Sequence, residues 1–570
     1  MSANVLPVVL MWHMHQPHYR DAETGEYQLP WTYLHAIKDY VDMVAYLEMQ
    51  PKARVVVNFT PVLLEQIDDY AQQLRAFIDN GVPISDPLLA ALAAEQVDED
   101  AEARLQILKA CLRANEKRLI QRYPAYDKLA RMARWVLENP EEVIYFDPQF
   151  FADLLVWYHL AWFAETERRK EPRLKALMKR RRCFSLQDRR LLLEMMAELL
   201  EQVIPRYRVL AEQGQIELSF SPYMHPILPL LEDFRSAAEA MPQVSLPQTP
   251  AYPGGDERAH WHMQQGLDVF QRYFGFRPRG CWPSEGAVSA DVVTLCEQFQ
   301  IDWLATGESV LRKTLERAPA LEQQLEGGCI HRSYRLGVQR PRLFFRDDGL
   351  SDLIGFTYSD WHADDAVNNL LHHLENIADA CDGADNRVVS IILDGENAWE
   401  YYPENAFYFL TALYQKLVDH PRLRMATFSD FLDEGKDSVS LETLVAGSWV
   451  YGTFSTWIGD ADKNRAWDLL CEAKRVFDEQ VARGRLKGKA LEKATHQLGI
   501  CEGSDWFWWF GDYNPAESVR DFERLYRTHL RKLYRLMGVE APAVLDQVIS
   551  QGGGAPAAGG VMRRGQEGDG

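Results

Sequence analysis

The fold is indicated most clearly by the stretch VVSIILDGEN, residues 388–397, in which a run of branched apolar side chains gives way to acidic and turn-forming residues. A continuous apolar run of this kind is typical of a parallel strand that is covered on both faces. It places Asp394 at the end of the strand, where α/β enzymes expose their catalytic groups. The segment GCWPSEG, residues 280–286, repeats this arrangement, because Glu285 follows a short apolar run and a stiff Trp-Pro pair.

Short apolar runs recur along the chain, and helical patterns separate most of them. The predicted strands span residues 5–12, 54–59, 215–220, 279–282, 301–306, 342–346, 388–393 and 423–428. Helical periodicity between the later strands is clearest over residues 366–380 and 405–417. Strand and helix that alternate seven or eight times predict a (β/α) barrel or a variant of one.

Two regions interrupt this alternation. From about residue 66 to residue 210 the sequence is dominated by charged helical stretches rich in Leu and Ala, which predicts a large helical insertion after the second strand. We therefore expect a catalytic barrel over residues 1–435, with the insertion inside it, and a C-terminal α-helical domain over residues 436–547. Residues 548–570 are rich in Gly and Ala with little to bury, so they predict a disordered tail.

The 570-residue chain carries a formal net charge of −21. Nucleic acid or an anionic membrane would repel this charge, so we expect neither as a partner and favour a neutral substrate. No apolar run approaches the roughly 18 residues that cross a bilayer, and residues 1–8 lack the basic start of a secretory signal, so we expect a cytoplasmic protein. The eight cysteines are scattered without a Cys-x-x-Cys pair, which indicates reduced thiols.

The first predicted strand ends in two histidines, His13 and His15, which alternate with Met14 and so share one face of the strand. Two histidines at the mouth of a barrel can bind a metal ion, donate hydrogen bonds to sugar hydroxyls, or serve a structural role. The ends of the later strands offer mainly carboxylates rather than further histidines. This composition argues against a required metal.

The third predicted strand also alternates, so Gln215 and Glu217 share a face while apolar residues occupy the other. A Glu that points inward is unfavourable unless it is paired or used, which makes Glu217 a candidate site residue. His225 follows in a polar loop after this strand. Arg346 ends the strand 342–346, where it could orient a carboxylate.

Cleavage of a glycosidic bond requires two carboxyl groups. One is neutral and protonates the leaving oxygen, and the other is ionised and interacts with the oxocarbenium-like anomeric carbon. Apolar neighbours and Glu396 would raise the pKa of Asp394 toward the acid role. In the C-terminal region, tryptophans stand beside acidic residues, as in walls that stack on sugars. The residues expected nearest the cleft there are Trp457, Glu502, Ser504, Asp505 and Trp506.

Five motifs, taken in order, resemble the sequence regions of glycoside hydrolase family 57, with the closest match to its α-amylase and amylopullulanase-like members. They are HMHQP at 13–17, GQIE at 214–217, WPSE at 282–285, DGENAWE at 394–400 and the tryptophan-rich region 448–512, and the resemblance covers about residues 5–540. It implies an incomplete (β/α)7 barrel with a helical C-terminal domain that closes over the cleft. It also implies a retaining mechanism on α-glucans that needs no metal and no cofactor.

The resemblance assigns a role to each motif residue. Glu285 would be the nucleophile and Asp394 the general acid/base, while Glu217 and the two histidines of the first strand would line the subsite around the scissile bond. One departure concerns Pro283 and Ser284, which stand where many members have Leu-Ala and would alter the loop around Glu285. The other expected substrate-binding residues are Gln16, His225, Trp282, Arg346, Glu396 and Trp399.

These expectations describe a retaining hydrolase of α-1,4 links in glycogen, starch or maltodextrins, and they leave open whether it also cleaves α-1,6 links. The alternative within the same family is a 4-α-glucanotransferase or an α-glucan branching enzyme, in which a sugar hydroxyl replaces water. Two other classes remain open: a metal-dependent amide hydrolase or deacetylase, and a glucan-binding protein without activity.

Overall fold

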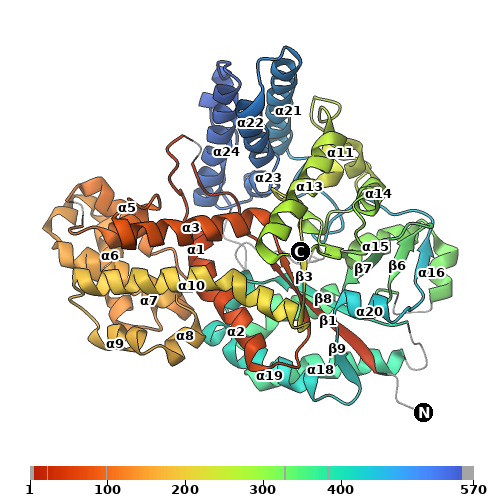
Figure 1. Cartoon of the computed structure of the whole chain (residues 1–570), viewed down its shortest axis with the longest axis horizontal. Helices are drawn as coiled ribbons and strands as arrows, with labels where there is room; N and C mark the ends of the chain where they lie inside the picture. The colour runs from red at the N-terminus through yellow and green to blue at the C-terminus, as the bar shows by residue number, and fades with distance from the viewer. Residues whose placement is uncertain (1–4, 22, 98, 326–328, 382–385, 555–570) are drawn as a thin grey trace.

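The computed structural model describes residues 5–554 apart from 22, 98, 326–328 and 382–385. At its centre lies a mostly parallel sheet in the strand order β10-β6-β7-β5-β4-β3-β2-β1-β8 (Figure 1). Seven of these strands form the curved parallel wall: β1 (Leu6–Met14), β2 (Val55–Phe59), β3 (Ile216–Phe220), β4 (Gly280–Cys281), β5 (Trp303–Gly307), β7 (Arg342–Arg346) and β8 (Val389–Asp394).

The two ends of this wall approach each other without forming a strand ladder in the described part of the chain. The backbone N–H of Asp347, just after β7, donates to the carbonyl of Ser390 on β8 at 2.8 Å. The predicted (β/α)7 barrel is therefore confirmed as an incomplete one, with a gap between β7 and β8.

Three short strands extend the sheet beyond the prediction. Strand β9 (Leu423–Met425) pairs with the start of β1, and the rest of the predicted strand 423–428 leads into helix α20 (Phe428–Asp433). Strand β6 (Tyr334–Leu336) runs antiparallel to β7, and β10 (Val439–Leu441) pairs with β6. Because β10 belongs to the sheet, the sheet reaches past residue 435, where the C-terminal helical domain was expected to begin.

Helices account for most of the remaining described chain. Between β2 and β3 they are α3 (Pro61–Asn80), α4 (Pro87–Ala93), α5 (Ala101–Cys111), α6 (Pro124–Glu138), α7 (Pro148–Trp162), α8 (Glu165–Lys170), α9 (Pro172–Arg180) and α10 (Leu186–Glu212). They form the helical insertion on one side of the barrel (Figure 1). Around the barrel lie α1 (Trp31–His35), α2 (Val41–Met49), α11 (Leu228–Glu232), α12 (Ala237–Ala240), α13 (Gly255–Phe274), α14 (Ala290–Gln298), α15 (Glu308–Glu316), α16 (Pro319–Leu325), α17 (Asp348–Asp352), α18 (Ala363–Ala380) and α19 (Phe407–Val418).

The C-terminal region contains α21 (Ala461–Ala482), α22 (Gly488–Cys501), α23 (Asp505–Trp509) and α24 (Ala516–Leu536), and the three long helices stand together above the barrel (Figure 1). The first part of the predicted disordered tail packs against this region, since buried Ser550 accepts a hydrogen bond from Gly511 N. Residues 555–570 lie outside the described residues. Among the helices described, none is both long and apolar enough to span a membrane.

The barrel interior has a small apolar core of its own. Val9 and Met11 alternate along β1 and point into it, and Phe428 and Phe431 of α20 close its amino-terminal end. Gly280 on β4 is required there, because a Cβ atom at this position would lie 1.8 Å from the Trp303 ring. The other members of this core are Val56, Trp282, Trp303, Ala305, Phe344, Val388, Ile392 and Ala426.

Glu217 belongs to this interior core layer and not to the mouth of the barrel. The strand register aligns Glu217 with Val56, whose partner is Met11, two residues below His13 on β1. Its carboxylate accepts hydrogen bonds from Trp303 Nε1 at 2.7 Å and from both the N–H and the hydroxyl of Ser429. The expectation that Glu217 lines the substrate subsite is therefore wrong. The side chain of Glu217 points into the barrel, as predicted. Glu217 is, however, the second residue of the five-residue strand β3, so it lies away from the carboxyl end of the strand, where the barrel mouth is.

We predict that Glu217→Ala lowers the free energy of unfolding by about 2–5 kcal/mol, because the buried donors of Trp303 and Ser429 lose their acceptor. Urea unfolding followed by circular dichroism measures this loss as a lower midpoint. Glu217→Gln, which keeps an acceptor oxygen, should lose less, and Glu212→Ala on the surface of α10 is the control. An unchanged midpoint for Glu217→Ala would contradict a structural role for this carboxylate.

Candidate functional site

A polar layer crosses the barrel directly above the Glu217 layer. Strand register aligns His13 on β1 with Asn58 on β2 and with Asp394 on β8, and Asn58 in turn with Ser219 on β3. His13 Nδ1 donates to Asn58 Oδ1 at 2.7 Å, and Asn58 Nδ2 donates to Ser219 Oγ at 3.1 Å. These strands therefore bring Asp394 to the same height as the first of the two predicted histidines.

Glu285 reaches the site from a single turn after β4. Its backbone has φ 59° and ψ 26°, the left-handed region that a non-glycine residue rarely adopts. Such a conformation costs on the order of 1–3 kcal/mol and persists only where neighbours hold it. Trp449 does so, because its backbone N–H donates to the Glu285 carbonyl at 3.1 Å and its indole Nε1 to Glu285 Oε2 at 2.9 Å.

Asp394 ends β8 and is fixed by the turn that follows it. Gly395 N donates to the carbonyl of His13 at 2.7 Å, and Asn397 Nδ2 donates to Asp394 Oδ2 at 3.0 Å. A side chain at Gly395 would lie 2.1 Å from the sulfur of Met14, so this close approach requires glycine. The turn thus ties Asp394 to the end of the neighbouring strand.

Glu285 and Asp394 line one cavity of about 390 Å³ at the barrel mouth. Its walls come from the ends of β1 and β8, from α1, and from α23 and α24 of the C-terminal region. Aromatic side chains form much of its surface: Tyr19, Trp31, Phe356, Tyr401, Trp449, Trp508, Trp509 and Phe522. The helical C-terminal region therefore supplies part of the cavity wall.

Burial makes the two carboxyl groups harder to ionise. Burial and the nearby Asp394 together raise the pKa of Glu285 to about 8, against the hydrogen bond from Trp449. Burial also raises the pKa of Asp394, and Asn397 opposes this shift. Because the pKa of Glu285 lies above neutral, the two carboxyl groups together hold at least one proton near pH 7. One acid and one base in one cavity can perform paired proton transfer and nucleophilic attack.

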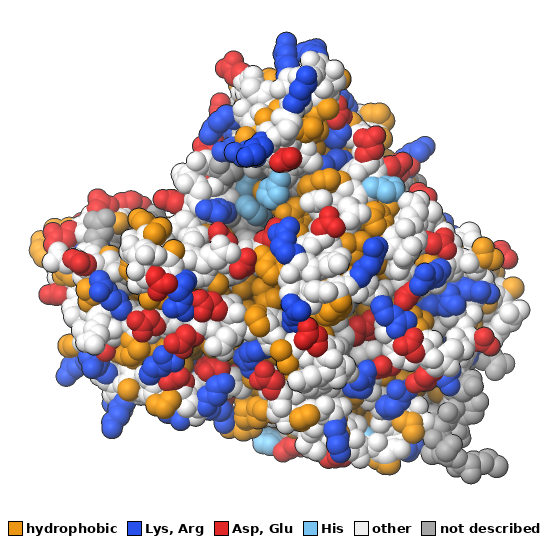
Figure 2. All heavy atoms as spheres, viewed as in Figure 1, with side chains coloured by type: hydrophobic (Ala, Val, Ile, Leu, Met, Phe, Trp, Pro, Cys, Tyr) orange, Lys and Arg blue, Asp and Glu red, His pale blue; other side chains and the backbone are white. Residues whose placement is uncertain are grey.

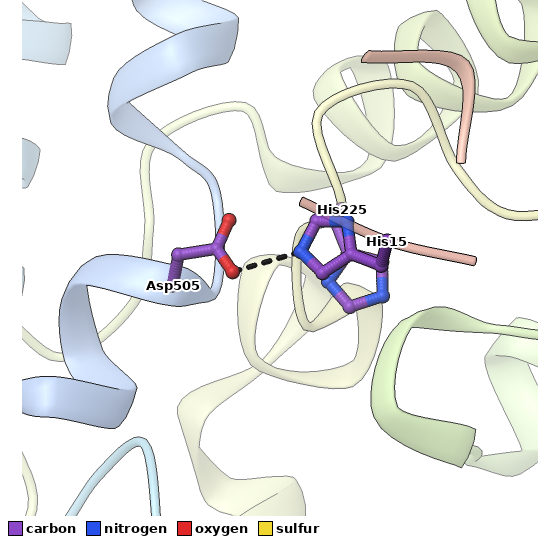
Figure 3. Close-up of side chains that lie close together, drawn as sticks. All are labelled: His15, His225 and Asp505. Carbon is purple, nitrogen blue, oxygen red and sulfur yellow. Dashed lines mark hydrogen bonds and ion pairs between the residues drawn. The ribbon is translucent and has the colours of Figure 1, made fainter. Parts of the chain in front are cut away.

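His15, His225 and Asp505 gather beside this pair (Figure 3). His15 Nε2 donates to Asp505 Oδ1 at 2.8 Å, and the His15 and His225 rings stack with centroids 3.8 Å apart. His225 Nδ1 lies 3.9 Å from Glu285 Oε1. Burial lowers the pKa of His13 to about 3 and lowers that of His225, so both rings are neutral.

These three residues offer ligand atoms within 4.8 Å of one another, a donor set that suits a transition metal. Their present contacts favour a hydrogen-bond network instead. His15 contacts Asp505 and Thr60 through its two nitrogens, and His225 Nδ1 lies 3.0 Å from Ser504 Oγ. The two rings are stacked and inclined by only 25°, so their planes run nearly parallel.

Gln16, Glu396 and Arg346 also line the cavity, as expected for site residues. Glu396 Oε1 accepts from Gln16 Nε2 at 3.2 Å and from His15 N at 3.3 Å. Arg346 is held by helix α17, which follows its strand, since its guanidinium donates to Asp348 and to Asp352, each at 2.7 Å.

Four predicted tryptophans are core residues and not parts of the cavity wall. Trp282, Trp399, Trp457 and Trp506 are each no more than 1% exposed. Trp399 Nε1 donates to the carbonyl of Gly395 and Trp506 Nε1 to that of Ile500, so these indoles are already satisfied by backbone. The expectation that these four rings bind substrate is wrong, because their large apolar area is buried between layers.

Glu502 is likewise buried outside the cavity. It is paired with Arg258 Nη2 at 2.7 Å and with His262 Nε2 at 2.8 Å, and Tyr252 OH donates to it at 2.6 Å. Burial favours its neutral form, but Arg258 and His262 outweigh this and lower the pKa of Glu502 to about 2. Glu502 was expected to contact substrate, but its carboxylate instead binds Arg258, His262 and Tyr252 in the core.

That ion pair anchors the segment that follows it. Ser504 N donates to the carbonyl of His225 at 2.9 Å, and the hydroxyl of Ser504 lies beside the same histidine ring. Ser504 is buried and holds His225, whereas Asp505 reaches the cavity. The C-terminal region thus orients two of the histidines at the site.

Several cavity residues were not singled out from the sequence. They include Tyr19, Trp31, Glu400, Tyr401, Trp508, Trp509, Glu517 and Asp521. Most come from the loop after β1 and from the C-terminal helices, where no strand-end pattern marks them. Trp449 stands in the segment 447–449, and only its contact with Glu285 distinguishes it from any other tryptophan.

Comparison with known proteins agrees with this geometry. Residues 9–442 match the model of glycosyl hydrolase family 57. Similar solved structures include a GH57-type branching enzyme from Pyrococcus horikoshii (17% identity, TM-score 0.55, 96% of this chain and 97% of that chain covered). They also include an alpha-amylase from Thermotoga maritima (12% identity, TM-score 0.56, 94% and 93% covered) and a 4-alpha-glucanotransferase from Thermococcus litoralis (13% identity, TM-score 0.51, 93% and 60% covered).

No match was found among curated proteins. The structural likenesses, all at low sequence identity, show a shared fold. The family match spans more than half of the chain and includes both Glu285 and Asp394. The protein therefore belongs to glycosyl hydrolase family 57.

Proposed function

We propose that this protein cleaves α-glucosidic bonds by a retaining double displacement, with Glu285 as nucleophile and Asp394 as general acid/base. The observation that carries the proposal is that these two carboxyl groups line one cavity and that Asp394 raises the pKa of Glu285. The role of each member follows from the resemblance of WPSE and DGENAWE to the family motifs.

The reaction proceeds in two steps. Glu285 attacks the anomeric carbon while the bond to the leaving oxygen breaks and Asp394 gives that oxygen its proton. Asp394, now ionised, takes a proton from water, and the resulting oxygen nucleophile displaces Glu285 from the sugar. The shared proton of the resting pair is the one that the first step consumes.

A neutral polymer of sugars suits the surroundings of this pair. On the face shown in Figure 2, basic side chains are interspersed with acidic ones, and the chain as a whole carries a charge of −21. Aromatic rings such as Trp31, Trp508 and Trp509 offer flat apolar surfaces, and His15 and Gln16 offer hydrogen bonds to hydroxyl groups. We therefore assign α-1,4-linked glucans, with α-1,6 links as further targets, in glycogen, starch or maltodextrins.

A cytoplasmic setting is part of the same proposal. All eight cysteines are free thiols, and six of them are buried. Free thiols fit a reducing compartment. Stored glycogen or maltodextrins inside the cell would then be the substrates.

The alternative outcome is transfer, as in a 4-α-glucanotransferase or a branching enzyme. After Glu285 is glycosylated, water and a sugar hydroxyl compete for the same intermediate. The aromatic wall formed by Trp508, Trp509 and Phe522 on the side of the C-terminal helices supports this alternative, because it could bind an acceptor sugar.

Incubation with amylose, pullulan and maltoheptaose, followed by sizing of the products, separates these outcomes. Hydrolysis predicts that reducing ends rise in proportion to the bonds cleaved, with amylose and maltoheptaose consumed. Redistribution of chain lengths without that rise would show transfer. Activity that vanishes after exhaustive chelation, or an absence of turnover together with glucan binding, would contradict the proposal in favour of the metal-dependent or the inactive alternative.

Chemical rescue by azide tests the two roles with α-glucosyl fluoride as substrate. Glu285→Ala and Asp394→Ala should each lose about 10³-fold or more of their activity on maltoheptaose. Azide should enter in place of Glu285 and yield the β-glucosyl azide, whereas Asp394→Ala should yield the α-glucosyl azide through the intact intermediate. The opposite pair of anomers, identified by NMR, would reverse the assignment.

The raised pKa of Glu285 predicts a pH-dependent effect on stability. The folded protein binds this proton more tightly than the unfolded chain, so stability falls as the pH rises from about 4.5 to about 8. Glu285→Gln removes the group, so its melting temperature should exceed that of the parent by a margin that grows to about 2–4 °C at pH 8. Glu212→Gln is the surface control. A margin that stays constant between pH 5 and pH 8 would contradict the raised pKa.

A further inference from the structure

The loop that carries Glu285 is clamped by a segment from outside the barrel. Val288 N donates to the carbonyl of Gly447 at 2.9 Å, and Gly447 N returns a bond to the carbonyl of Val288 at 3.1 Å. Trp449 N then donates to the carbonyl of Glu285. Residues 447–449 thus run antiparallel to the Glu285 loop and hold its backbone at two positions.

The indole of Trp449 has little freedom to move away from Glu285. A Cβ atom at Gly307 would lie 2.6 Å from Trp449 Cα, so the backbone of Trp449 rests directly on β5. The Trp282 ring meets the indole edge-on, with centroids 5.2 Å apart and planes inclined by 80°. The Arg346 guanidinium lies over the same indole, 5.4 Å from the ring centroid.

This packing has an electrostatic consequence for the indole N–H. A cation over the face of the ring draws electron density toward itself, which makes the N–H a stronger donor. The Arg346 charge is itself compensated by Asp348 and Asp352, so it stays in place. The donor therefore points at Glu285 Oε2 with its direction fixed before any substrate binds.

The two oxygens of Glu285 are left in different environments. Oε2 accepts the Trp449 indole bond at 2.9 Å, while Oε1 faces His225 Nδ1 at 3.9 Å and accepts no hydrogen bond from the described residues. An oxygen that accepts a strong hydrogen bond is a weaker nucleophile than one that accepts none. The free oxygen is thus the one poised to attack.

We propose that Trp449 is a positioning residue that holds Glu285 Oε2, so that Oε1 is the oxygen that attacks the anomeric carbon. This proposal rests on the nucleophile role assigned to Glu285 above. Trp449 acts through Glu285 and is not itself a catalytic residue. Its predicted effect is therefore on kcat and on the pH profile more than on the binding of glucan.

The test compares Trp449→Phe, which keeps an aromatic ring but loses the N–H, with Trp162→Phe. Trp162 of α7 is buried, and its indole nitrogen has no partner among the described residues, which makes it a matched control. Trp449→Phe should lower kcat on maltoheptaose about 10- to 100-fold, the loss typical of a hydrogen bond to a charged group, with KM changed less than about threefold. The acid limb of kcat/KM should move to higher pH, and that of Trp162→Phe should not.

A merely structural role for Trp449 would lower the amount of folded enzyme while leaving the acid limb in place, and this outcome would overturn the proposal. Gly307→Ala provides a second variant, because it keeps the indole but displaces its backbone, and it should move the acid limb in the same direction.

Direct titration of Glu285 keeps this test separate from that of the proposed function. In ¹³C-glutamate NMR, the signal that disappears in Glu285→Gln reports the ionisation of this carboxyl. The apparent pKa of that signal should rise in Trp449→Phe and stay unchanged in Trp162→Phe. If the parent enzyme cleaves no glucan and yet the shift occurs, the proposed function fails while the Trp449 contact stands. An unchanged titration in Trp449→Phe would overturn the positioning role in either case.

Discussion

The parallel register of β1 with its neighbours is the constraint on which the site depends. Strand β1 pairs with β2, β8 and β9, and every residue from Leu6 to Met14 is buried. Because side chains alternate across a strand, Val9 and Met11 fill the barrel while His13 reaches its mouth. The pairing of His13 with Asp394 then sets the height of the acid, and a slip of one residue would turn Asp394 out of the barrel.

Placing two carboxyl groups in one buried cavity has an energetic cost, which neighbouring elements offset. Burial and mutual repulsion raise the pKa of Glu285, while Trp449 supplies a hydrogen bond and Asn397 supplies one to Asp394. Glu285 also adopts a left-handed backbone conformation. The C-terminal region contributes here as much as the barrel, because Trp449 and Asp505 both come from beyond β10. Burial and charge repulsion, which make ionisation of the pair unfavourable, also favour a state with one proton that can be donated and one carboxylate that can attack.

The sequence was sufficient for features that depend on local periodicity. The strand-end positions of Glu285 and Asp394 and the common face of His13 and His15 follow from alternation and from the change of apolar to polar residues. The height of a residue in the barrel does not follow from alternation. Glu217 points inward as predicted but lies one layer too low.

Side-chain contacts between residues that are distant in the sequence could not be predicted either. Glu502 stands in an acidic, tryptophan-rich segment, yet Arg258 and His262 on α13 bind it in the core. An indole can lie in a core or in a cavity wall, and the composition of a segment does not predict which of the two places its tryptophans occupy. Trp506 and Trp508, two residues apart on α23, lie respectively in the core and at the cavity. Tertiary packing decides which indole faces a ligand.

In the proposed reaction, Glu285 forms the covalent bond to the sugar. A fluorinated α-glucosyl fluoride that forms its glycosyl-enzyme faster than it loses it would trap that bond, and peptide mass mapping would locate it. One added sugar should then be found on the peptide that contains Glu285, and none in Glu285→Gln. A sugar attached to Asp394 or to any other residue would contradict it.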